Sequence, residues 1–84
     1  MNHKATTKDE LFLLKLYEMA TQLGGPEEEV DRFAVGRAIG QNDKGIIVIV
    51  RHLAQANFVK KGSGDALYLT PHGLKLAMQI AKER

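Results

Sequence analysis

The sequence predicts one small α+β domain that is mostly helical, with three helices, a β-hairpin and a C-terminal helix in that order. Three observations predict this order. Apolar residues recur at helical spacing through residues 11–23, residues 58–69 hold two short β-forming runs around a glycine-rich centre, and Thr70-Pro71 precedes a further amphipathic segment. A chain of 84 residues can bury one modest core but not a deep enzyme cavity, so we expect a single domain and no enzyme.

The first helix is expected over about residues 8–23. Thr7 and Glu10 have the spacing of a capping box, in which each side chain bonds the backbone N–H of the other residue. The apolar face that follows comprises Phe12, Leu16, Met19 and Leu23, with Leu11 and Leu14 widening it. Two glycines and a proline at 24–26 end the helix.

A short second helix is expected over about 32–39, capped by Asp31 and ended by Gly40. The third helix then begins near Asn42 or Asp43, since both residue types favour the N-cap position. We expect Val35 and Ile39 of the second helix to point inward.

Residues 46–50, Ile-Ile-Val-Ile-Val, suit either a buried strand or the middle of this third helix. On a helical wheel the residues separate into an apolar face (Ile46, Ile49, Val50 and Leu53) and a polar face (Lys44, Arg51 and Gln55). Burying each isoleucine contributes ~1.5–3 kcal/mol, whereas helix propensities differ by only tenths of a kcal/mol per residue. A helix over about 43–56 is therefore predicted. Ile47 and Val48 remain on or beside its polar face, where apolar residues are unexpected.

A β-hairpin is expected next, with 62–65 (Gly-Ser-Gly-Asp) as its tip. Thr70 and Pro71 suit the N-cap and first position of the last helix. The inner stripe of that helix is expected to comprise Leu74, Ala77, Met78 and Ala81.

Charge is distributed unevenly along the chain. Residues 1–31 carry three lysines and seven acids, a net charge of −4, whereas residues 32–84 carry nine lysines or arginines and three acids, a net charge of +6. A basic C-terminal part is typical of proteins that bind polyanions, although a solvated mixed surface gives the same pattern.

Several other classes of site are disfavoured. The chain has no cysteine, so disulfides and thiolate metal sites are excluded. His52 and His72 lack a second ligand at metal spacing, and Ser63 lacks a catalytic partner, so neither a metal, a cofactor nor a nucleophile is expected.

No apolar run approaches the ~20 residues that a membrane-spanning helix needs, and the N-terminus lacks the apolar centre of a secretory signal. We expect a cytoplasmic protein with no membrane partner, nucleoid-associated if it is prokaryotic.

Residues 32–53 resemble a helix-turn-helix, with Gly36 where the two helices cross and Gly40 in the turn. Residues 57–61 (NFVKK) resemble the "G-L-V-x-R" step into a wing. Residues 69–77 (LTPHGLKLA) resemble the "L-T-x-x-G-x-x-x-A" signature of MarR-like and PadR-like winged-helix regulators. Gln41 departs from the pattern, because the family usually has an apolar residue there. The resemblance covers about 30–84.

This resemblance implies a winged helix-turn-helix fold in one domain, 1–84. It places the helix-turn-helix at about 32–56, the wing at about 57–70 and the C-terminal helix at about 71–83. It also implies a transcriptional regulator that inserts the helix 43–56 into the major groove of duplex DNA and lays the wing on the backbone. The residues carried over to the DNA side are Asn42, Lys44, Gly45, Ile47, Val48, Arg51 and His52 from the helix, and Lys60, Lys61, Ser63 and Gly64 from the wing.

Ile47 and Val48 leave a second function open. A helix that reads DNA usually presents polar groups, whereas exposed apolar residues favour a winged helix that contacts another protein and binds no DNA.

A homodimer through the first and last helices is also expected, because both have more apolar residues than one core face requires. The predicted interface comprises Leu11, Leu14, Leu76 and Ile80. The alternative is that a small domain leaves some leucines exposed.

Overall fold

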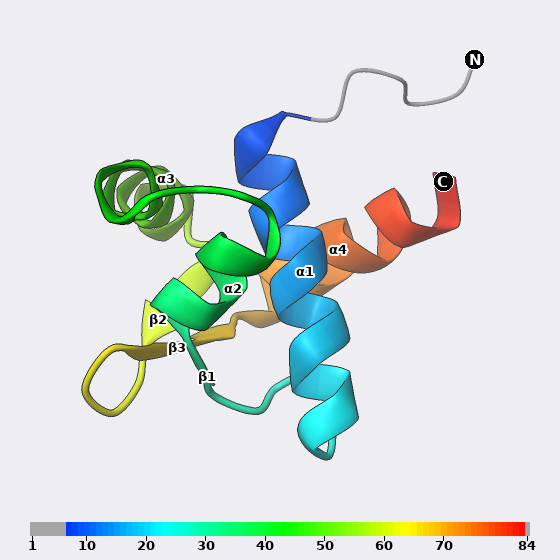
Figure 1. The fold of residues 1–84 in the computed structure, drawn as a ribbon. Helices are drawn as coiled ribbons and strands as arrows, with labels where there is room; N and C mark the ends of the chain where they lie inside the picture. Colours follow the sequence, from blue (N-terminus) through cyan, green and yellow to red (C-terminus); the bar gives the residue numbers. More distant parts are fainter. Residues whose placement is uncertain (1–6, 84) are drawn as a thin grey trace.

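The computed structural model describes residues 7–83, and within them it has four helices and a three-stranded antiparallel sheet (Figure 1). The elements are α1 (Lys8–Leu23), β1 (Val30–Asp31), α2 (Arg32–Ala38), α3 (Asp43–Gln55), β2 (Val59–Lys61), β3 (Ala66–Leu69) and α4 (Pro71–Glu83). The predicted α+β class and its order of helices and hairpin are confirmed. None of the helices in residues 7–83 is long and apolar enough to cross a membrane.

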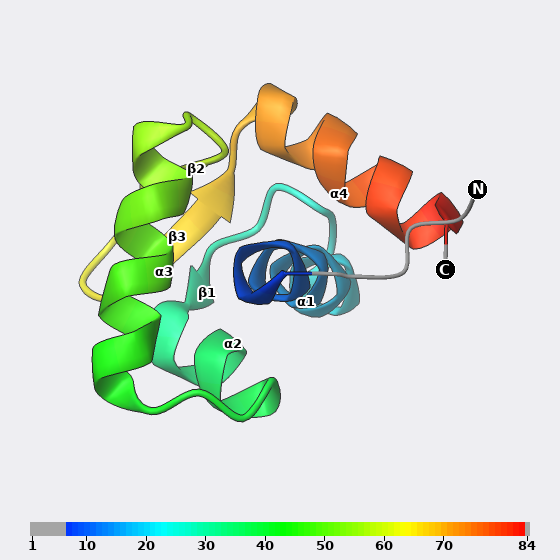
Figure 2. The same ribbon diagram turned by 90° about the horizontal axis from the view of Figure 1, so that it is seen from above.

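Helix α1 lies at the centre of the domain, and Figure 2 looks almost along its axis, with α2, α3 and α4 around it. Its predicted capping box is present: the Thr7 hydroxyl accepts from the Glu10 N–H at 3.1 Å, and the Glu10 carboxylate accepts from the Thr7 N–H at 3.1 Å. At the other end, Gly24 has φ 146°, a backbone conformation that other residues rarely adopt. Helix α1 therefore starts and stops where the sequence predicts.

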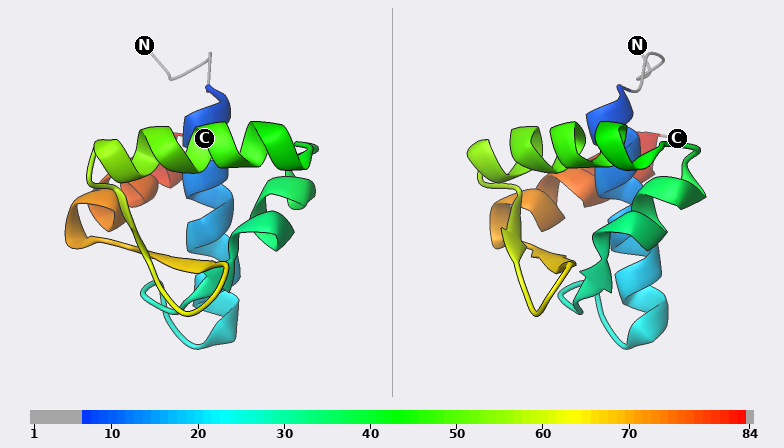
Figure 3. Two further views of the ribbon diagram at one scale, coloured as in Figure 1. Left: turned by 90° about the vertical axis from the view of Figure 1, so that its left-hand side faces the viewer. Right: turned by 60° about the vertical axis from the view of Figure 1, so that its left-hand side comes forward.

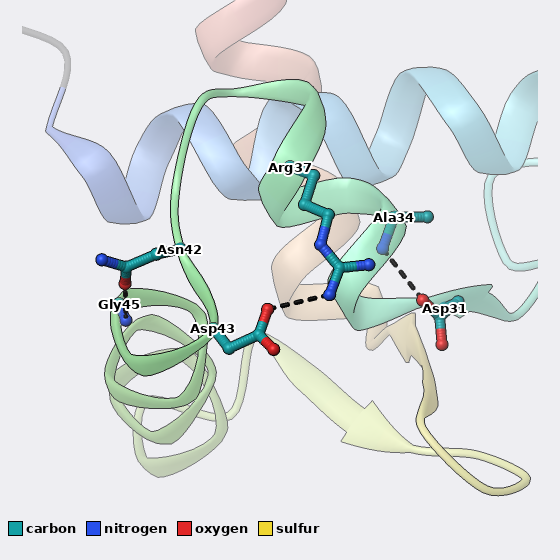
Figure 4. Close-up of polar contacts among 6 residues, drawn as sticks. All are labelled: Asp31, Ala34, Arg37, Asn42, Asp43 and Gly45. Atoms are coloured by element: carbon teal, nitrogen blue, oxygen red, sulfur yellow. Dashed lines mark hydrogen bonds and ion pairs between the residues drawn. The ribbon is translucent and has the colours of Figure 1, made fainter.

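The crossing of α2 and α3 depends on one missing side chain. A Cβ atom on Gly36 would overlap the Ile46 side chain, so the two helices approach as closely as they do because residue 36 is glycine. The turn between them contains Gly40 at φ 82°, and Asp31 caps α2 by accepting from the Ala34 N–H at 2.9 Å (Figure 4). The predicted roles of Gly36, Gly40 and Asp31 are confirmed.

Residues 46–50 lie entirely within α3, so the helix prediction is confirmed and the strand is excluded. The four residues predicted to face inward are all buried: Ile46, Ile49, Val50 and Leu53. They join residues of α1, α2 and the sheet in one apolar core. Burial of this face outweighs the local β preference of the sequence.

The sheet has one strand that the sequence analysis missed. β1 pairs with β3, and the strand order is β1-β3-β2, with Val30 opposite Leu67 and Val59 opposite Leu69. With only two residues, β1 is too short to show alternation of apolar and polar positions. The predicted hairpin 58–69 is confirmed as β2 and β3.

A tight junction joins the end of α3 to the start of α4. Asn57 has φ 65°, a left-handed conformation that asparagine adopts more readily than most residues. The buried Thr70 hydroxyl donates to the Asn57 carbonyl at 2.6 Å and accepts from the Gly73 N–H at 2.9 Å. The ring of His72 stacks on that of Phe58, with centroids 4.7 Å apart.

The predicted inner stripe of α4 is right for Ala77, which is buried, and for Leu74, which packs against the core, but wrong for Met78 and Ala81. Met78 is 52% exposed and Ala81 is exposed, whereas Gly73, Ala77 and Ile80 are buried. Gly73 has no side chain, so an apolar pattern does not detect that this position faces inward.

Burial within one chain removes two residues from the predicted dimer interface. Leu14 and Ile80 are buried within the single chain, on α1 and α4, which pack against each other. Leu11 and Leu76 are half-buried. Half of the residues expected to hold two copies together are therefore buried inside one copy.

Candidate nucleic-acid interface

Helix α3 and the hairpin β2–β3 occupy the same side of the molecule. In Figure 3, left, α3 crosses the front of the domain with its whole length uncovered, and the hairpin lies below it. Figures 1 and 2 show the same grouping from two other directions. The end of α3 contacts β2, which fixes the hairpin relative to the helix.

The outer face of α3 carries cations at both ends and an apolar pair between them. Lys44 and Arg51 are exposed, and between them Ile47 is 48% exposed and Val48 is 41% exposed. The sequence analysis placed these four side chains outward, and the structure confirms that placement. An uncovered isoleucine and valine on a helix whose other face is fully packed form the most unusual surface feature of this side.

The first turn of α3 uses two polar side chains for its own structure (Figure 4). The Asn42 amide oxygen accepts from the Gly45 N–H at 2.8 Å, and the Asp43 carboxylate pairs with the Arg37 guanidinium at 2.9 Å. Asn42 was predicted to contact DNA. In this conformation it offers only its NH₂ group, because the oxygen is occupied as the helix cap.

His52, also expected on the DNA side, pairs instead with Asp9 of α1. Its Nδ1 lies 3.2 Å from the Asp9 carboxylate, and both side chains are partly exposed. The pair links the C-terminal half of α3 to the N-terminal end of α1. His52 is therefore turned toward α1 and contributes to holding α3 in place.

The hairpin presents two adjacent cations and a tip that is tied to the body of the domain. Lys60 and Lys61 are exposed on β2. The Ser63 backbone N–H, at the tip, donates to the Glu29 carboxylate at 3.1 Å. Ser63 was predicted to contact DNA, but its N–H is already used and a carboxylate lies beside it.

The two elements of this side, α3 and the hairpin, carry four exposed cations: Lys44, Arg51, Lys60 and Lys61. Among residues 7–83, none of the four forms an ion pair. Unpaired, hydrated cations on two neighbouring elements can neutralise phosphates without first breaking an internal pair. The arrangement thus suits a polyanion that runs across α3 and along the hairpin.

Sequence reasoning missed Glu29 and Arg32, which contact the hairpin tip from either side of β1. Glu29 belongs to the acidic run 27–29 that precedes β1. Its partner is 34 residues away in the sequence, and without β1 no pattern connects the two.

Comparisons of this chain with protein-family models, curated proteins and solved structures found no match.

Proposed function

We propose that this chain is a winged helix-turn-helix domain that binds duplex DNA as a transcriptional regulator. The close α2–α3 crossing at Gly36, the strand order β1-β3-β2 and the hairpin beside α3 support this fold assignment. In such domains the second helix of the motif enters the major groove, and the hairpin follows the phosphate backbone.

One observation carries the proposal: α3 and the hairpin lie on one side of the molecule, and together they carry four exposed cations that form no ion pair within residues 7–83. Arg51, Lys60 and Lys61 suit phosphate oxygens. Lys44, in the first turn of α3, suits the base edge of guanine or a phosphate, and the free NH₂ of Asn42 adds one donor nearby. Ile47 and Val48 lie between these groups, where contact with a thymine methyl would bury them.

Exposure of Ile47 and Val48 supports a second candidate function, a protein-interaction module. An apolar pair flanked by cations suits an amphipathic acidic segment of another protein, which would cover the pair and meet Lys44 and Arg51. The predicted homodimer has less support, because Leu14 and Ile80 are buried within one chain.

The hairpin lysines should contribute phosphate contacts without sequence preference. We expect Lys60→Ala combined with Lys61→Ala to weaken binding uniformly across duplex sequences. The plot of log affinity against log salt should become less steep by about two units of slope, because each lost phosphate contact lowers the magnitude of the slope by about 0.9. Fluorescence anisotropy with labelled duplexes at several salt concentrations measures both quantities.

A matched control is Lys75→Ala combined with Lys82→Ala, which removes two exposed cations from α4. It should leave the slope nearly unchanged. Equal slopes for the hairpin variant and the wild type would remove the hairpin from the interface.

A further inference from the structure

The hairpin tip is held from two sides by the residues that flank β1. Before β1, the Glu29 carboxylate accepts from the Ser63 N–H at 3.1 Å. After β1, the Arg32 backbone N–H and Nε donate to the Asp65 carbonyl at 3.0 and 2.9 Å. β1 itself pairs with β3 between these two points. The tip is thus attached to the same segment that starts α2.

Glycine at position 62 makes room for the Glu29 side chain. A Cβ atom at this position would overlap the Glu29 carboxyl group, so the carboxylate lies directly against the tip. The hairpin closes through other groups: the Gly62 N–H donates to the Ala66 carbonyl and the Ala66 N–H to the Ser63 carbonyl, both at 2.9 Å. The Ser63 N–H takes no part in that closure, and Glu29 is its partner.

We propose that Glu29 is a positioning residue that fixes the hairpin tip and, through its charge, limits the affinity of the hairpin for DNA. Its hydrogen bond orders the tip next to Lys60 and Lys61, so less conformational entropy is lost when phosphate binds. Its negative charge lies against the hairpin tip, beside Gly62 and Ser63, and repels phosphates that approach Lys60 and Lys61. The DNA part of this inference rests on the proposed function.

Two substitutions separate the two effects. Glu29→Gln keeps an oxygen acceptor of the same length and removes the charge, whereas Glu29→Ala removes both. Glu27→Gln is the control, because Glu27 is exposed on the same loop and forms no bond to the hairpin. Comparing Gln with wild type isolates the charge, and comparing Ala with Gln isolates the hydrogen bond.

The first readout is the solvent-exchange rate of the Ser63 backbone amide, measured by NMR on the free protein. We expect Glu29→Ala to raise this rate about fivefold, the change expected on losing one hydrogen bond of ordinary net strength. Glu29→Gln should keep most of the protection, and Glu27→Gln all of it. An unchanged Ser63 rate in Glu29→Ala would overturn the positioning role.

The second readout is affinity for random duplex DNA at low salt. Glu29→Gln should bind about twofold to fivefold more tightly than wild type, with the difference shrinking as salt screens it. Glu29→Ala should bind about fivefold more weakly than Glu29→Gln, and the Lys60→Ala/Lys61→Ala effect should be smaller in its background. Equal affinities of the Gln and Ala variants would overturn the link between positioning and binding.

The two readouts test claims that can be overturned independently. A wild type that binds no duplex overturns the proposed function and the DNA part of this inference together. Faster Ser63 exchange in Glu29→Ala would in that case still support the positioning role, because it is measured without DNA.

Discussion

Replacing Gly73 with alanine is expected to destabilise the domain by about 3 kcal/mol, a large part of the stability of a domain this small. A Cβ atom there would overlap the Phe58 carbonyl oxygen, which is backbone and cannot rotate away as a flexible side chain does. That oxygen already accepts from the Thr70 N–H at 3.1 Å, so moving it costs a hydrogen bond at the α3–α4 junction as well. Urea denaturation followed by circular dichroism measures the change.

The sign of this effect is informative, because alanine is intrinsically better than glycine inside a helix by about 1 kcal/mol. Without the overlap, Gly73→Ala would stabilise α4. Gly25→Ala is the control: a Cβ atom at position 25 meets nothing within 4 Å, so its free energy of unfolding should stay close to that of the wild type. A Gly73→Ala variant as stable as this control would show that α4 does not pack on Phe58 as described.

Reversing the two cations on the outer face of α3 is expected to have the largest effect on DNA binding. Lys44→Glu combined with Arg51→Glu should weaken affinity about 100-fold at low salt, because two attractive phosphate contacts become repulsive. Stability should change little, since both side chains are exposed. Fluorescence anisotropy gives the affinity, and circular dichroism confirms the fold.

Lys75→Glu combined with Lys82→Glu reverses the same number of charges on α4 and should weaken binding far less. If both double variants lose affinity equally, binding depends on net charge alone and α3 is not the contacting element.

The helices were predictable where their boundaries and periodicity agree. Capping residues at Thr7, Asp31 and Asn42 mark three helix starts, and each caps in the structure. The β-branched run 46–50 was assigned to a helix from its position on a helical wheel, which places Ile46, Ile49 and Val50 on one apolar face with Leu53.

The features missed by the sequence analysis have two physical causes. Strand β1 exists because β3 offers it a partner, and two residues carry no periodic signal of their own. The inner face of α4 was only partly predicted, because close packing on Phe58 requires a glycine at position 73 and apolar periodicity gives a glycine no weight.

The candidate site was predictable in part. Periodicity alone puts Lys44, Ile47, Val48 and Arg51 outward. Asn42 was predictable as a helix cap, and that role occupies the oxygen that was expected to be available to DNA. The roles of His52 and Ser63 depend on partners that only the fold brings close, Asp9 and Glu29 respectively. The link between Ser63 and Glu29 requires the fold, because it joins two loops that only the sheet brings together.

The most direct test of DNA binding is a fluorescence-anisotropy titration of the wild-type chain with random duplex DNA at several salt concentrations. We expect binding at low salt and a linear loss of log affinity with log salt, as phosphate contacts by α3 and the hairpin require. No binding at low salt would contradict the proposal, and would favour a protein partner on the Ile47–Val48 surface.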